Sequence, residues 1–322
     1  MIIDFEHHYF PEELMRRLGA KPGESFVWRH GAKPRLTMHD GLFDMEEHLR
    51  NMDIAGIDVA VLSGWDPPLE DCRVINDSLA RLQGEYGGRF IGLAHTQPLR
   101  GKEALDELQR ATQELGLKGA VITATVEGKP LDSPELYPFY EKAAELDIPV
   151  YVHPSTIFEG FDFLDAPYDM YRSLGREVDV LTATSRLIMS GILDDFPSLN
   201  FIISHLGGGI AAVAERFSVG GVLAGAGHLP GSRMTKPYGE YLDRFYFNMA
   251  GYEGGMKAVA CALVALSPQR LLFATDYPQN FLADGPGMKR YVDAIGELPL
   301  SRGDLDDMMG RNAARLLKLP NP

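Results

Sequence analysis

Four residues whose side chains bind metals or carry protons stand at the ends of short apolar segments. Glu6 and His8 close the first segment, His153 lies near the end of the fifth, and Asp276 near the end of the eighth. Side chains two residues apart in a strand share a face, so Glu6 and His8 point the same way. Two imidazoles and two carboxylates form a ligand set for one divalent ion. We expect Zn²⁺ first, with Mn²⁺ compatible with the oxygen ligands.

Three further histidines occupy similar places along the chain. His7 points away from Glu6 and His8, His95 follows the third apolar segment, and His205 follows the sixth. A single histidine near a strand end is more often a hydrogen-bonded structural residue than a ligand. We expect this structural role for His7 and His95.

The apolar segments that carry these residues are too short for helices and are bounded by turn residues, which is typical of buried strands. Sequences with helical periodicity separate them, such as the one that follows the candidate N-cap Asp44. The predicted strands are 2–8, 58–64, 90–96, 119–125, 149–155, 200–206, 245–251 and 271–277, and the predicted helices include 44–52, 101–115, 135–146, 181–196 and 255–266.

Eight alternating strand and helix units predict an α/β fold, a (β/α)8 barrel, with a doubly wound open sheet as the alternative. We predict one domain over residues 1–322, because no low-complexity linker interrupts the series. Three longer connections, 9–43, 156–180 and 207–244, follow predicted strands and would form the rim of the active site. The four candidate ligands would then meet at the C-terminal mouth of the barrel.

Composition excludes several kinds of partner. The formal net charge of −14 argues against nucleic acid, which requires a field of Lys and Arg. No apolar run is long enough to span a bilayer. Cys72 and Cys261 are too few for a disulfide framework, which favours the cytoplasm.

Several motifs resemble a known family. They are EHH at 6–8, PVYVHPS at 149–155, the stretch 185–209 that ends in SHLGGG, RLLFATDYP at 270–278 and GRNAARLLKL at 310–319. Together they resemble the amidohydrolase superfamily, in the branch of aminocarboxymuconate-semialdehyde decarboxylase and the dihydroxybenzoate (resorcylate) decarboxylases. The resemblance implies a metal-dependent barrel with Glu6, His8, His153 and Asp276 as ligands and His205 as a catalytic histidine beside the metal. It also implies a homodimer or a higher homo-oligomer.

Two departures bear on the reaction. Most relatives begin with His-x-His, whereas Glu-x-His, as in Glu6-His7-His8, is found in the dihydroxybenzoate decarboxylases. Those enzymes often have an H-x-G-E-G pattern after the sixth strand, whereas this chain reads HLGGG and has Gly208 in place of the glutamate. The first departure favours decarboxylation and the second does not. The glycine triplet itself is expected to be a tight turn rather than a phosphate cradle.

These observations predict a metal-dependent decarboxylase of a small aromatic or unsaturated carboxylic acid, with His205 or Asp276 supplying the proton. The alternatives are a hydrolase or hydratase of the same family, acting on a lactone, a C–C bond or an unsaturated acid, and a binding barrel without catalysis. Arg172, Arg186 and Lys129 are candidates to position the substrate, although each alone is expected to be a surface charge. An aromatic loop at 158–163, with Tyr168 and Tyr171, could wall the pocket.

Overall fold

The structure is a computed structural model. It describes residues 1–31, 33–65, 67–156, 164, 168, 170–223, 231–250, 255–281 and 283–319, with the backbone alone for 218–223.

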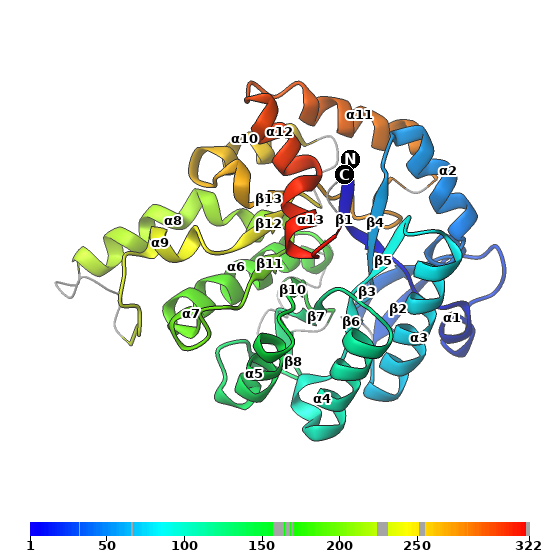
Figure 1. The fold of residues 1–322 in the computed structure, drawn as a ribbon, viewed down its shortest axis with the longest axis horizontal. Coiled ribbons are helices and arrows are strands. Elements are labelled where there is room, and N and C mark those ends of the chain that lie inside the picture. The colour runs from blue at the N-terminus through cyan, green and yellow to red at the C-terminus, as the bar shows by residue number, and fades with distance from the viewer. Residues whose placement is uncertain are drawn as a thin grey trace.

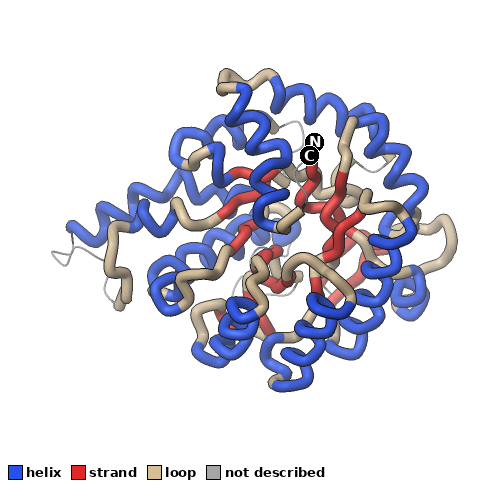
Figure 2. The backbone as a smooth tube through the Cα atoms, viewed as in Figure 1, coloured by secondary structure: helices blue, strands red, loops and turns tan. Residues whose placement is uncertain are grey.

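Parallel strands form the centre of the molecule and match all eight predicted strand segments (Figures 1 and 2). Their order around the barrel follows the order of the chain. The third segment is divided at Leu93: β5 pairs with β4, and β6 pairs with β7. The strands are β1 (Ile3–His8), β4 (Val59–Ser63), β5 (Phe90–Gly92), β6 (Ala94–His95), β7 (Ala120–Thr123), β10 (Val150–His153), β11 (Phe201–Ile203), β12 (Tyr246–Asn248) and β13 (Leu271–Leu272).

Backbone hydrogen bonds join the last strand segment to the first. Phe5 N–H donates to the Phe273 carbonyl at 2.9 Å, and His8 N–H donates to the Tyr277 carbonyl at 2.6 Å. Between them, Asp276 N–H donates to the Glu6 carbonyl at 2.9 Å. The sheet is therefore closed, and the predicted (β/α)8 barrel is confirmed over the open-sheet alternative. Closure also brings residue 276 beside residue 6.

Helices surround the strands as an outer layer (Figure 2). The Asp44 side chain caps α2 by accepting from Glu47 N–H, as its place in the sequence predicts. Gly56 ends this helix with a φ of 75°. The helices are α1 (Glu12–Arg17), α2 (Met45–Ala55), α3 (Leu69–Glu85), α4 (Lys102–Gln109), α5 (Tyr137–Glu145), α6 (Leu174–Met189), α7 (Ile192–Asp195), α8 (His205–Leu223), α9 (Tyr238–Leu242), α10 (Met256–Ala265), α11 (Gly285–Gly296), α12 (Arg302–Asp306) and α13 (Asn312–Leu316).

The long connections contain more structure than the sequence predicts. The first holds α1 and a hairpin of β2 (Phe26–His30) and β3 (Lys33–Met38). In the second, α6 begins at Leu174, although apolar periodicity places the start of this helix at residue 181. Charged side chains on the first turns of α6 face the barrel mouth, as described below, and so interrupt the apolar pattern that marks a helix.

The barrel interior is packed below the mouth. Phe5 and Tyr151 meet edge to face, with ring centroids 5.7 Å apart. Leu316, the last residue of α13, and Leu317 join this cluster. Figure 1 shows α13 lying across one end of the barrel. Asn312 is buried and donates to the Leu271 carbonyl at 2.8 Å, so its role is structural. None of the described helices has the length and hydropathy needed to cross a bilayer.

Candidate metal centre

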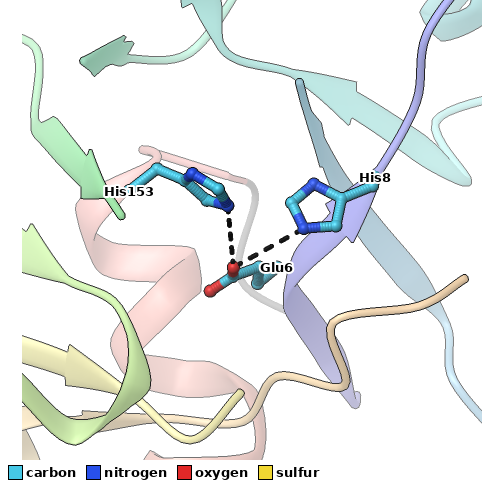
Figure 3. A group of neighbouring side chains, drawn as sticks. All are labelled: Glu6, His8 and His153. Carbon is cyan, nitrogen blue, oxygen red and sulfur yellow. Dashed lines mark ion pairs between the residues drawn. The ribbon is translucent and has the colours of Figure 1, made fainter. Parts of the chain in front are cut away.

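Glu6, His8 and His153 converge at the C-terminal mouth of the barrel. Glu6 and His8 extend from β1, and His153 ends β10 (Figure 3). Glu6 Oε1 lies 3.5 Å from His153 Nε2 and 3.7 Å from His8 Nε2. The three candidate donor atoms lie within 4.8 Å of one another, and all three side chains are buried. The alternation that predicts a shared face for Glu6 and His8 is confirmed.

Asp276 lies beside these three residues. Its Oδ1 is 2.8 Å from His8 Nε2, and its Oδ2 accepts a hydrogen bond from Asn280 Nδ2 at 3.0 Å. The backbone of Asp276 has a φ of 60°, which is uncommon for a residue with a side chain. Asp276 therefore extends the cluster through His8, and the four predicted ligands occupy one contiguous site.

The hydrogen bonds of Glu6 leave one oxygen for a cation. Oε2 accepts from Asn248 Nδ2 at 2.7 Å, whereas no donor among the described residues reaches Oε1. A buried carboxylate oxygen without a partner is costly. The nitrogen atoms around Oε1 belong to histidine side chains, which are metal ligands when neutral. This arrangement suits a divalent ion.

The two histidines are oriented as metal-binding histidines usually are. His8 Nδ1 lies 3.3 Å from the Ser63 carbonyl, and His153 Nδ1 lies 2.8 Å from the Pro154 carbonyl. A carbonyl oxygen can only accept, so each Nδ1 carries a hydrogen, and each Nε2 faces the cluster. His8 Nε2 also contacts Asp276 there. Such outer hydrogen bonds fix the ring and its tautomer in metal sites.

The charges of this cluster shift the pKa values of its members. Burial raises the pKa of Glu6, but the neighbouring His205, His153 and His8 outweigh burial and lower it below its ordinary value. Burial lowers the pKa of His153 to about 3, so this ring is neutral and able to ligate. Burial also lowers the pKa of His8, but its hydrogen bond to Asp276 and the charges of Asp276 and Glu6 raise it overall.

His205 faces the same cluster from the end of β11. Its Nε2 is 3.7 Å from Glu6 Oε1, and its Nδ1 is 2.9 Å from Glu177 Oε1. The backbone N–H of His205 donates to Asn248 Oδ1 at 3.0 Å, and Asn248 Nδ2 donates to Glu6, so Asn248 links the two residues. Burial lowers the pKa of His205, but Glu177 and Glu6 raise it well above its ordinary value. The structure thus brings together the four predicted ligands and the predicted catalytic histidine.

Three other site residues were missed by sequence reasoning. Asn248 ends β12. It is a polar residue near the end of a predicted strand, and the sequence could therefore have indicated it as a site residue. Arg176 and Glu177 lie on the first turn of α6, where the sequence predicts a loop. Arg176 faces the pocket over the cluster, which has these lining residues: His8, Leu36, Trp65, His153, Pro154, Arg176, His205, Asp276 and Gln279.

The cations considered from sequence lie elsewhere or have other contacts. Arg186 pairs with Asp132 at 2.7 Å, and Lys129 pairs with Glu135 at 3.0 Å, both in partly exposed ion pairs. Arg172 donates to Thr37 Oγ1 at 3.2 Å. Arg186 and Lys129 are therefore surface charges, as expected for each alone. The aromatic loop at 158–163 lies outside the described residues.

The glycine triplet forms a turn, as predicted. The backbone from Leu206 to Gly209 has positive φ angles of 50° to 82°, a left-handed turn that precedes the regular part of α8. Glycine adopts this conformation at little cost.

Three comparisons relate the chain to known proteins. The amidohydrolase family model matches residues 3–319. A gamma-resorcylate decarboxylase of Rhizobium sp. (strain MTP-10005) is 27% identical, over 98% of this chain and 97% of that protein. A 2-amino-3-carboxymuconate-6-semialdehyde decarboxylase of Dictyostelium discoideum is 26% identical, over 99% and 92%.

A solved structure shares the fold. It is a 5-carboxyvanillate decarboxylase from Novosphingobium aromaticivorans, crystallised as a mutant with bound manganese and 3-methoxy-4-hydroxy-5-nitrobenzoic acid. The TM-score is 0.79 at 25% identity, over 99% of this chain and 97% of that one.

Proposed function

The chain belongs to the amidohydrolase family, and we propose that it is a metal-dependent, non-oxidative decarboxylase of a small aromatic or unsaturated carboxylic acid. The observation that carries the proposal is the buried Oε1 of Glu6, which accepts no hydrogen bond from any described residue and which three histidine Nε2 atoms surround at 3.5 to 3.7 Å. Decarboxylases that match nearly the whole chain support the same reaction class.

Glu6, His8 and His153 would hold the ion, with Asp276 as the fourth ligand. When bound, a divalent ion supplies a Lewis acid and a template for a carboxylate and a neighbouring hydroxyl or carbonyl. Either Zn²⁺ or Mn²⁺ suits two imidazoles and two carboxylates. The manganese in the related 5-carboxyvanillate decarboxylase favours Mn²⁺ more than the sequence alone does.

Arg176 is the residue best placed to hold the substrate carboxylate. Arg176 lines the pocket with His8, His153 and His205, and its guanidinium donates to the Arg35 carbonyl at 3.0 Å, which fixes its direction. Burial lowers the pKa of Arg176, so the desolvated cation gains from an anionic partner. The charge of Asp276 already favours this cation, and an anionic substrate would supply a further partner.

His205 delivers the proton. Loss of CO₂ breaks the bond between the carboxylate carbon and the substrate carbon, and the electron pair left on the substrate carbon takes a proton. His205 Nε2 faces the cluster and can donate that proton. Burial lowers the pKa of His205, but Glu177 and Glu6 raise it well above its ordinary value, which favours the protonated form that an acid needs. Asp276, hydrogen-bonded to His8, is the second candidate donor.

The test is CO₂ release from a panel of hydroxybenzoates and carboxymuconate-type acids, with the protein loaded with Zn²⁺ or Mn²⁺. In D₂O, the product should carry one deuterium on the carbon that lost CO₂. Hydrolysis of a lactone or hydration of an unsaturated acid, without CO₂ from any panel member, would contradict the proposal in favour of the hydrolase or hydratase. Failure to retain any metal under metal-replete conditions would favour a binding barrel.

A further inference from the structure

Glu177 makes a short contact with the proposed acid. Its Oε1 lies 2.9 Å from His205 Nδ1, and both side chains are largely shielded, with exposed fractions of 25% for Glu177 and 6% for His205. Glu177 lies in the first turn of α6, where a negative charge is favourable. The opposite edge of the His205 ring faces Glu6. The ring therefore lies between two carboxylates that come from different elements.

The left-handed glycine turn makes this contact possible. A Cβ atom at Gly208 would lie 1.9 Å from the Glu177 carbonyl oxygen, so no side chain fits there without displacing the start of α6. Gly208 is also the position where the related H-x-G-E-G pattern has glutamate. In this chain, the space that a side chain at 208 would occupy is filled by the backbone of Glu177, whose own carboxylate reaches His205.

The contact fixes where His205 can exchange a proton. A carboxylate has only acceptor atoms, so the nitrogen that it contacts must carry hydrogen. With Nδ1 protonated, only Nε2 can gain or lose a proton, and Nε2 is the atom that faces Glu6 and the pocket. A carboxylate plays this part in the serine protease triad, where it holds the histidine in the correct tautomer and orientation.

We propose that Glu177 is the positioning residue for His205 and that it confines proton transfer to Nε2. The inference rests on the proposed function for its kinetic consequence, but the tautomer itself can be measured without a substrate. Two neighbouring residues of the first turn of α6 then have separate roles. Arg176 binds the substrate anion, and Glu177 holds the ring of His205 in the tautomer with hydrogen on Nδ1.

The kinetic test compares Glu177→Gln with Glu177→Ala. Glutamine has nearly the same shape, but its amide can donate to Nδ1 and favour the tautomer with hydrogen on Nε2. We expect both variants to lose about 10- to 100-fold in kcat, part of the ~10²–10⁴ that a positioned acid contributes. KM should change less than about threefold, because Glu177 is not among the described residues that line the pocket. Glutamine would restore activity if the role of Glu177 were only to fill space.

The second measurement needs no activity. Nitrogen NMR of protein labelled with ¹⁵N-histidine and loaded with diamagnetic Zn²⁺ reports which ring nitrogen of His205 carries hydrogen; comparison with His205→Asn identifies the signal. We expect hydrogen on Nδ1 in the wild type throughout the pH range, and on Nε2 in neutral Glu177→Gln. Thr182→Ala, on the exposed side of α6, is the control for both experiments.

The outcomes separate the two proposals. A bare Nδ1 in the wild type, or a wild-type kcat in Glu177→Gln, would overturn the positioning role. Absence of CO₂ release from any acid by the wild type would instead overturn the decarboxylase, and the NMR result would still decide the role of Glu177.

Discussion

The two faces of β1 carry the same kinds of side chain in different surroundings. On the inner face, which carries Glu6 and His8, Glu6 Oε1 accepts no hydrogen bond from the part of the chain that the structure describes. On the outer face, His7 Nδ1 lies 2.8 Å from Asp4 Oδ2, and His7 Nε2 lies 3.0 Å from His48 Nδ1. His48 Nε2 continues this chain to the Gly41 carbonyl at 2.6 Å.

The difference lies in whether the polar atoms are satisfied. Every nitrogen of His7 and His48 has a partner, and Asp4 also accepts from Thr275 N–H at 2.9 Å. Such a closed network stabilises the fold and leaves nothing for a ligand. The cluster around Glu6 is buried as deeply but is left incomplete, which is what a binding site requires. Burial and residue type alone do not distinguish the two networks.

The largest expected effect comes from breaking the inner cluster. His153→Ala should lose the bound metal and reduce activity by at least about 100-fold, since loss of even an outer partner of a metal site costs about 10–100-fold. Elemental analysis and the CO₂ assay measure the two effects. The apparent stability without added metal should change little. Retention of about one metal equivalent per chain would show that His153 is not a ligand.

A substitution in the outer network, formed by Asp4, His7 and His48, should lower stability and leave metal binding unchanged. His48→Ala leaves His7 without its acceptor and opens a cavity, which should lower the free energy of unfolding by roughly 2–4 kcal/mol. Metal content per folded chain should remain that of the wild type. Urea unfolding followed by circular dichroism provides the measurement. A variant as stable as the wild type but free of metal would reverse the comparison between the faces.

His95 is a further buried histidine with which the two networks can be compared. Its Nε2 accepts from Gly64 N–H at 2.9 Å and its Nδ1 donates to the Leu93 carbonyl at 3.1 Å, so the ring is neutral and structural, as expected. Burial lowers its pKa to about 4.

The direction of the pH effect follows from that shift. A histidine with a lowered pKa in the folded protein takes up its proton more readily when unfolded. Its contribution to stability is therefore present above pH ~6.5 and is lost as the pH falls towards 4, by up to about 3 kcal/mol. Urea unfolding of the wild type and His95→Gln between pH 7 and 4 should show a smaller decline in the variant. Parallel declines would contradict the assignment.

The smallest effects come from two arginines of the same helix. Arg176→Ala removes a charge-assisted contact worth about 1.5–3 kcal/mol, so KM for the carboxylic acid should rise about 10- to 100-fold. Arg186→Ala is the matched control, because Arg186 pairs with Asp132 in an exposed ion pair. It should leave KM unchanged and cost at most about 1 kcal/mol of stability. Steady-state kinetics of both variants tests the difference, and an equal rise in KM would remove Arg176 from the site.

Much of this site was predictable from strand ends. Alternation places Glu6 and His8 on one face of the first strand. A barrel brings the ends of β1, β10 and β11 to one mouth, so the sequence alone could predict that Glu6, His8, His153 and His205 lie close together. Arg176 and Glu177 could not be found in that way. They lie on a helix whose first turns face the pocket rather than the core, which removes the apolar period that marks a helix.

The sequence by itself determined the eight strand segments and the polar residues at their ends, because period-two alternation and turn residues are local properties of the chain. Alternation allowed both a barrel and an open sheet, and the hydrogen bonds that join β1 to residues 273–277 decided for the barrel. Only the tertiary structure decided which buried oxygen lacks a donor and which carboxylate reaches His205. Those facts depend on distances between residues far apart in the sequence, such as Glu6 and Asn248, or Glu177 and Gly208. Local patterns carry no information about such contacts, and closure of the barrel creates them.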